Sequence, residues 1–196
     1  SLARDRNMQA GKYDEVKTGK YLGKDGGFAI ITGEGKIIYD STGSLKRDFT
    51  PGEIDCIQPY DEQSYINYVS FTNEEGNQEH LLTKYTFRDN GDTDEQVMIL
   101  DDNYVVQEGG VGDGRSSYTP QEFEYLTSQY SDGPVYLKYD ISGTLSGNKA
   151  VENAKYLVVM SYDSSLYSYQ NMYSKADRVF LLMIPLYLIA IVSFLL

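Results

Sequence analysis

Short apolar runs alternate with polar or glycine-containing breaks over the first 160 or so residues of the chain. In residues 134–142, Val135, Leu137 and Tyr139 are separated by Tyr136 and Lys138. Such alternation is typical of a strand with one buried face. The same reasoning predicts strands at residues 27–32, 36–41, 65–72, 79–87, 96–101, 104–108, 134–142 and 155–163. Short turns join neighbouring strands, so the pattern predicts antiparallel pairing.

Two short helices are predicted from the same start sequence. Thr50-Pro51-Gly52-Glu53 and Thr119-Pro120-Gln121-Glu122 each match a capping box with proline at the first helical position. An apolar or aromatic residue precedes each box, at a position that braces the entry of a helix. Pro59 is expected to end the first helix. Many strands with few, short helices indicate an α+β fold with antiparallel sheets.

An internal repeat at an offset of 69 residues relates the two halves of this pattern. Phe28–Ile31 (FAII) corresponds to residues 97–100 (VMIL), and residues 49–54 correspond to residues 118–123. With one residue of slip, residues 65–71 correspond to residues 135–141. Matching order and spacing predict a duplicated strand-strand-helix-strand-strand unit, with copies at 27–88 and 95–163. The repeat fits two small lobes or one sheet built from both copies.

The pattern changes after Tyr162. Residues 164–178 are predicted to form a helical stalk, because apolar residues recur at coiled-coil spacing, at Leu166, Tyr169, Tyr173, Ala176 and Phe180. This stripe could join two copies of the chain or pack on the preceding domain. A homodimer is the partner state that the stalk favours.

Residues 179–196 carry no charge and are apolar on every side. A helix of this length spans roughly 27 Å, close to the hydrocarbon core of a bilayer at about 30 Å. A buried core helix is the alternative, but a core helix usually keeps a polar stripe. We therefore predict a transmembrane segment, with Lys175 and Arg178 as interfacial anchors. The protein is expected at the cell membrane, with residues 1–178 mostly extracellular.

Composition and charge narrow the function classes. The 196 residues have a formal net charge of −12, which argues against nucleic acid as a partner. One cysteine excludes an intramolecular disulfide, and one histidine leaves little for triad or metal chemistry. Residues 1–26 are basic and are expected to be a membrane-proximal lead to the acidic domain at 27–163. No catalytic residue and no cofactor is predicted.

Two segments could hold a ligand. Asp89, Asp92 and Asp94 place oxygen ligands around a glycine, as calcium sites do, although the spacing is not that of an EF-hand and favours a solvated hairpin turn. Arg115 follows a glycine-rich stretch at 109–114 and is available for an anionic ligand, if that stretch is more than a flexible loop. Cys56 is expected to be a buried or half-buried structural thiol, and His80 a surface side chain.

The chain resembles the extracytoplasmic sensor regions of bacterial membrane receptors. The hairpin GFAIITGEGKIIYDS resembles the opening hairpin of PAS-like and Cache-type sensor domains, and segments within residues 97–163 are similar to sensor regions of histidine kinases from Gram-positive anaerobes. The resemblance extends over residues 27–196. It implies a first transmembrane helix before the sensor and, after Leu196, a HAMP linker, a phosphoacceptor helix and an ATPase domain.

This resemblance predicts an extracellular sensor of a two-component receptor that binds a small-molecule or peptide signal. The terminal helix would carry the response across the bilayer. The fragment itself would perform no chemistry. The alternative is a membrane-anchored surface protein for adhesion or assembly. What the gene encodes after Leu196 separates the two: a kinase module supports the receptor, and a stop codon supports the surface protein.

Overall fold

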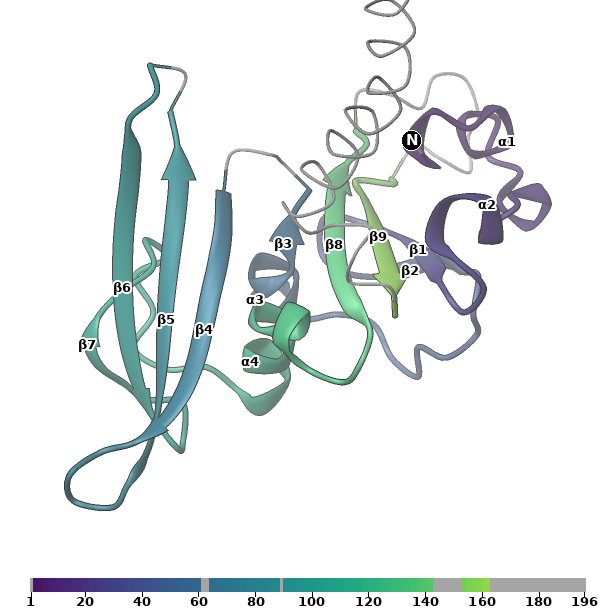
Figure 1. Ribbon diagram of the computed structural model, residues 1–196. Coiled ribbons are helices and arrows are strands. Elements are labelled where there is room, and N and C mark those ends of the chain that lie inside the picture. Colours follow the sequence, from purple (N-terminus) through teal and green to yellow (C-terminus); the bar gives the residue numbers. More distant parts are fainter. Residues whose placement is uncertain (1, 61–63, 89, 143–152, 163–196) are drawn as a thin grey trace, which may run out of the picture. The chain divides into compact units, whose positions relative to one another are not determined.

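The computed structural model describes residues 2–60, 64–88, 90–142 and 153–162. These residues belong to one compact unit, Ser1–Tyr162. They form two mostly antiparallel sheets with a few short helices, so the predicted α+β class is confirmed (Figure 1). The predicted stalk and apolar segment lie outside the described residues. Within the described ranges, no helix has the length and apolar character needed to cross a bilayer.

The first sheet has five strands in the order β2-β1-β9-β8-β3. Its members are β1 (Gly27–Ile31), β2 (Ile37–Asp40), β3 (Gln58–Pro59), β8 (Val135–Asp140) and β9 (Tyr156–Ser161). All its pairings are antiparallel except the short contact of β3 with β8. The strand β3 was not predicted, and the expectation that Pro59 ends a helix is wrong. The helix ends earlier, at Cys56, and Pro59 belongs to β3.

The second sheet has four strands in the order β4-β5-β6-β7, all antiparallel. Its members are β4 (Ser64–Thr72), β5 (Gln78–Phe87), β6 (Thr93–Asp101) and β7 (Val106–Gly109). Each predicted strand is present, and β6 begins three residues before its predicted start. The sequence from residue 93 onward therefore extends the sheet instead of continuing the turn.

Each sheet combines hairpins from both halves of the chain. The five-stranded sheet joins the β1–β2 hairpin to the distant β8–β9 pair, through the contact of β1 with β9. The four-stranded sheet joins the β4–β5 hairpin to the β6–β7 hairpin. Neither half of the chain completes a sheet by itself, which two separate lobes would require.

The same local geometry recurs at the offset of 69 residues. Thr32 Oγ1 accepts hydrogen bonds from the backbone N–H groups two and four residues ahead, and Asp101 Oδ1 does the same in the second turn. Gly35 and Tyr104 both have positive φ, and each backbone carbonyl accepts the N–H of the residue 14 positions later. The β1–β2 and β6–β7 pairings also contain a register shift at matching positions.

Helices α3 (Pro51–Cys56) and α4 (Pro120–Leu126) lie between the two sheets (Figure 1). Both predicted capping boxes are present: Thr50 and Thr119 cap the helices, and the glutamate side chain of each box accepts from the cap backbone. Apolar side chains of both helices share one core with both sheets. Its central members are Ala29, Ile31, Ile54, Leu82, Met98, Leu100, Phe123, Leu126, Val158 and Met160.

The N-terminal residues cover the other side of the five-stranded sheet. They form η1 (Leu2–Arg4), α1 (Arg6–Gln9), η2 (Tyr13–Glu15) and α2 (Gly19–Leu22). Figure 1 shows α1 and α2 on the side of this sheet that faces away from α3 and α4. The predicted basic lead is thus in contact with the domain, and both faces of β1 and β9 are buried.

Candidate functional site

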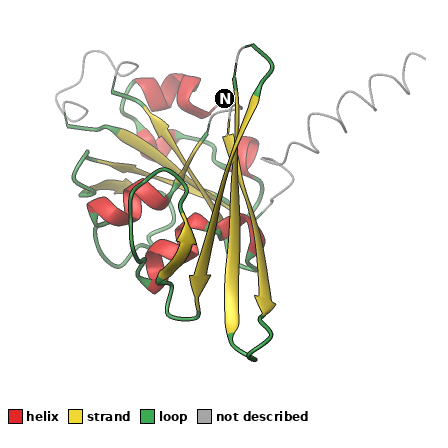
Figure 2. Ribbon diagram, turned by 90° about the vertical axis from the view of Figure 1, so that its left-hand side faces the viewer, coloured by secondary structure: helices red, strands yellow, loops and turns green. Residues whose placement is uncertain are grey.

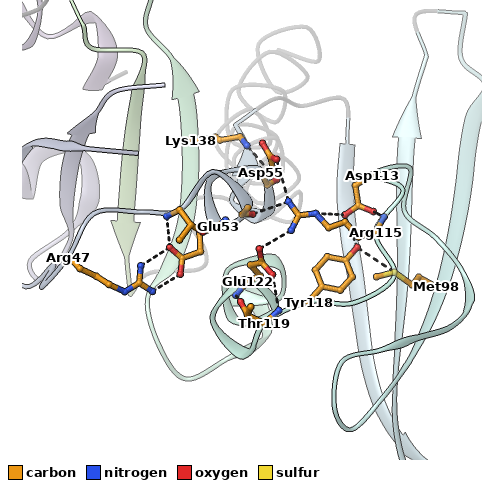
Figure 3. Close-up of polar contacts among 12 residues, drawn as sticks. Arg47, Glu53, Asp55, Met98, Asp113, Arg115, Tyr118, Thr119, Glu122 and Lys138 are labelled. Carbon is orange, nitrogen blue, oxygen red and sulfur yellow. Dashed lines mark hydrogen bonds and ion pairs between the residues drawn. The ribbon is translucent and has the colours of Figure 1, made fainter. Parts of the chain in front are cut away.

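A group of charged and polar side chains joins α3, α4 and both sheets, and we name it the interhelical cluster (Figure 3). It consists of Arg47, Glu53, Asp55, Asp113, Arg115, Tyr118, Glu122 and Lys138. The capping boxes place a glutamate in the first turn of each helix, and each glutamate is bound by an arginine from the preceding loop. The two Thr-Pro-x-Glu capping boxes at the N-termini of α3 and α4 therefore position the two glutamates of the cluster.

Glu53 is held on two sides. Its carboxylate accepts two hydrogen bonds from Arg47, at 2.9 and 2.5 Å, and one from the backbone N–H of Thr50 at 2.8 Å. The guanidinium lowers the pKa of this buried carboxyl below its ordinary value, and the Thr50 backbone bond adds to the effect. Glu53 therefore stays ionised and caps α3 by charge and by hydrogen bonds.

Arg115 connects the two helices. Its Nη1 donates to Glu122 Oε1 of α4 at 2.9 Å, and its Nη2 donates to the backbone carbonyl of Gly52 and to Asp55 of α3 at 3.2 and 3.3 Å. Asp113 adds an ion pair at 3.5 Å from Nε. One planar guanidinium thus ties together three carboxylates and a carbonyl, a geometry that lysine could not reproduce.

Gly52 allows this close approach of the helices. A Cβ atom at residue 52 would clash with Oε1 of Glu122, which Arg115 holds in place. The second copy has Gln121 at the corresponding position of its capping box. The two copies of the capping box therefore differ at this position, which is glycine only in the helix that Glu122 approaches.

Two further contacts extend the cluster into the sheets. Lys138 of β8 donates to the backbone carbonyl of Ile54 at 2.5 Å, near the end of α3 where a cation is favoured, and burial lowers the pKa of its amine. On the other side, the Tyr118 hydroxyl donates to Asp113 at 2.7 Å and lies 3.6 Å from the sulfur of Met98 in β6. The interhelical cluster therefore contacts both sheets.

Cys56 lies beside the cluster and is buried, as predicted. Burial raises the pKa of its thiol to about 12, so the thiolate is scarce near neutral pH. A scarce thiolate makes a poor nucleophile and a poor metal ligand. The interhelical cluster as a whole is suited to holding α3 and α4 together. Because its contacts are ion pairs and hydrogen bonds, they can change partners without breaking a covalent bond.

The structure places Arg115 inside this cluster and not on a free loop. Its side chain is 20% exposed and already contacts carboxylates, so an anionic ligand would have to replace one of them. Asp55 is the most exposed of these partners. Ligand binding by Arg115 stays a prediction. An anionic ligand would most readily displace the contact of Arg115 with Asp55.

The predicted calcium ligands are spread over a turn and a strand. Asp94 lies in β6 and is paired with Arg88 at 2.5 Å, and Asp92 accepts from the side chain of Asn90 at 2.7 Å. Asp89 lies outside the described residues. In the part of the chain that the structure describes, no group of three or more His, Cys, Asp or Glu side chains is placed to hold a metal ion. The calcium site stays a prediction.

Sequence reasoning missed an aromatic group beside the cluster. His80 is half-buried instead of on the surface, and its Nδ1 lies 2.9 Å from the Tyr68 hydroxyl. Its ring packs on Phe123 of α4, and Tyr104 stacks on the same phenylalanine at 4.3 Å between centroids. Burial lowers the pKa of His80. The alternation in β5 places residue 80 on the same face as buried Leu82, which is the pattern that could have located it.

Comparison with protein-family models, with curated proteins and with solved structures finds no match to this chain.

Proposed function

We propose that this chain is the extracellular signal-sensing part of a membrane sensor histidine kinase, with a PAS-like domain built from a duplicated unit. The observation that carries the proposal is the position of the two ends of the domain. Gly27, at the start of β1, pairs with Met160, near the end of β9. The start of β1 and the end of β9 thus lie side by side, which suits a domain held at one membrane surface.

The central position of β9 supports a route for transmission. It pairs with β1 on one side and β8 on the other, and the segments predicted as stalk and membrane span follow it in the sequence. Lys138 of β8 contacts the end of α3, and Arg115 links α3 to α4. A signal that changes the helix contact would shift β8 and β9, and the stalk of a homodimer would carry the shift inward.

The recurrent geometry supports the duplicated unit. The turns, register shifts and capping boxes that repeat at 69 residues are local features, and local features survive when distant contacts change. In this proposal, an ancestral pair of identical units exchanged hairpins to form two mixed sheets, and later joined into one chain.

Thermal unfolding of the full chain in lipid nanodiscs tests whether it binds a signal. The compounds are amino acids, small carboxylates, peptides and calcium, and a native-state ligand raises the midpoint temperature saturably. A carboxylate that stabilises the native protein but not the Arg115→Ala variant would place the ligand at the interhelical cluster. A folded protein that no compound stabilises contradicts the small-molecule form of the proposal.

Labelling with a membrane-impermeant maleimide tests the location. The protein carries Cys56→Ser together with Asn103→Cys in the exposed turn before β7, and is produced in intact bacteria. The proposal expects labelling of the membrane-bound protein without lysis. Labelling only after lysis, or recovery of the protein outside the membrane fraction, contradicts it.

A further inference from the structure

The outer face of the four-stranded sheet is bare among the described residues. This face points away from α3 and α4, and in Figure 2 it is turned toward the viewer with the helices behind it. Cross-strand pairing aligns Val69 with Leu81 and Ile99, and the next row holds Val97. The side chains of Val69 and Val97 are 51% and 42% exposed. Val69, Leu81, Val97 and Ile99 thus lie next to one another on this face, and exposed apolar groups of this kind can mark interaction sites.

The same places in the five-stranded sheet are covered. There Ile30 aligns with Leu157 and Tyr139, and the next row holds Phe28 and Val159. Phe28, Ile30, Leu157 and Val159 are completely buried. The N-terminal segment, residues 2–22, lies over this face (Figure 1). Two sheets with matching rows of apolar residues therefore differ in whether a helical segment covers them.

The segment that covers the first sheet has a definite chemistry. Its buried residues are apolar or aromatic: Leu2, Met8, Tyr13, Val16 and Leu22. Its exposed charged side chains are mostly basic: Arg4, Arg6, Lys12, Lys17 and Lys20, against the acidic Asp14 and Glu15. A short amphipathic segment with a basic outer surface is thus able to seal a sheet face of this geometry.

The negative charge on the outer face of the four-stranded sheet favours a basic partner over a second copy of the same face. Its outward strand positions include the carboxylates Glu79, Glu95, Asp101 and Glu108, and none of the outward positions of β4 to β7 is lysine or arginine. A second copy of the same face would bring like charges together, which costs free energy. A basic amphipathic segment satisfies both the apolar centre and the acidic margin.

We infer that the outer face of the four-stranded sheet is a docking surface for a partner protein that presents a short, basic, amphipathic helical segment. The inference rests on the proposed sensor function in one respect: the bound partner protein would then be the signal that the sensor receives. The bound segment would lie over Val69, Leu81, Val97 and Ile99, with its cations near Glu79 and Glu95. It would cover the apolar surface that the described residues leave exposed.

The test uses the full chain in nanodiscs and a synthetic peptide with the sequence of residues 2–24, which has the stated chemistry. We expect saturable binding that weakens as salt is raised from about 0.05 to about 0.5 M. Val97→Lys should weaken binding by about tenfold or more, because it removes apolar contact and repels the cations. Val105→Lys is the matched control, since Val105 is 40% exposed and lies in the β6–β7 turn, and it should leave binding unchanged.

A photo-crosslinking group at position 8 of the peptide identifies the face that is used. Crosslinks to β4, β5 or β6 support the inference, and crosslinks to β1 or β9 overturn it because they show exchange onto the first sheet. Equal binding by the native protein and Val97→Lys overturns it, as does self-association of the chain that Val97→Lys abolishes. These readouts need neither membrane crossing nor kinase output, so the receptor proposal and this inference can fail separately.

Discussion

At the residue scale, burial decides how much each ion pair contributes to the stability of the folded protein. Arg115 is largely shielded and contacts partners on α3, on α4 and in the preceding loop. Arg88 forms a shorter pair with Asp94, but both side chains are well exposed to water. Exposed pairs are screened and contribute little, whereas removal of one shielded partner leaves carboxylates without compensation.

We expect Arg115→Ala to lower the free energy of unfolding by about 2–4 kcal/mol. Arg88→Ala, the matched control with 59% side-chain exposure, should cost less than about 1 kcal/mol. Denaturant unfolding of the full chain in detergent micelles measures both. Equal losses for the two variants would mean that the interhelical cluster does not hold the helices together.

Cys56 provides a second prediction at this scale. Because burial raises the pKa of the thiol to about 12, native protein at pH 8 should react with a maleimide roughly a thousandfold more slowly than a free cysteine peptide. Its rate should rise as pH is raised toward that pKa, and unfolding in urea should restore fast labelling. Labelling of the native protein at the peptide's rate would show that the thiol is accessible and ionised.

Sequence reasoning identified Arg115 but not its environment. Asp55 and the Gly52 carbonyl are about sixty residues earlier in the chain, and no local pattern indicates that they reach the guanidinium. Cys56 was placed correctly because burial of a lone cysteine is the common case. The contacts that give a charged side chain its role depend on the tertiary fold.

At the scale of elements, local chemistry was sufficient for the hairpins and the helix starts, but not for β3. The hairpins and both capping boxes were predicted because each depends on a few neighbouring residues. The strand β3 was missed because it has only two residues and pairs in parallel with a distant strand. Tyr104 takes a positive φ without being glycine, which hid the match of its turn with that of Gly35.

Glycine substitutions separate backbone conformation from close packing. Gly35 and Gly43 both have positive φ, so alanine at either should cost about 1 kcal/mol from conformation. Only at Gly35 would a Cβ clash with the backbone of Phe49, which adds about 1–3 kcal/mol. Thermal unfolding of Gly35→Ala and Gly43→Ala compares them. A midpoint for Gly35→Ala equal to that of Gly43→Ala would refute the tight contact between this turn and the backbone of Phe49.

At the scale of the molecule, the two halves depend on each other. The central contacts of β1 with β9 and of β5 with β6 join hairpins from different halves. The repeat itself was visible in the sequence, but the pairing between halves was not, because it involves residues up to 133 positions apart, as for Gly27 and Met160. The sequence could not choose between separate lobes and mixed sheets.

Fragments test this dependence. We expect residues 1–90 and residues 91–196, produced separately in detergent, to lack cooperative unfolding, because each lacks half of every sheet. Mixing or co-production should restore a folded complex through the exchanged hairpins. Cooperative unfolding of either fragment alone would show that a half folds by itself and would rule out obligatory pairing.

The central claim is that the domain passes a change in its helix contact through β9 to a kinase. The most direct measurement is the autophosphorylation of a chimeric receptor in which residues 1–196 precede a HAMP linker and histidine kinase module. At equal membrane abundance, Arg115→Ala should change the basal phosphorylation severalfold, whereas Arg88→Ala should leave it unchanged. Basal phosphorylation that is the same in both variants, with the chimera inserted and the kinase active, would contradict the account.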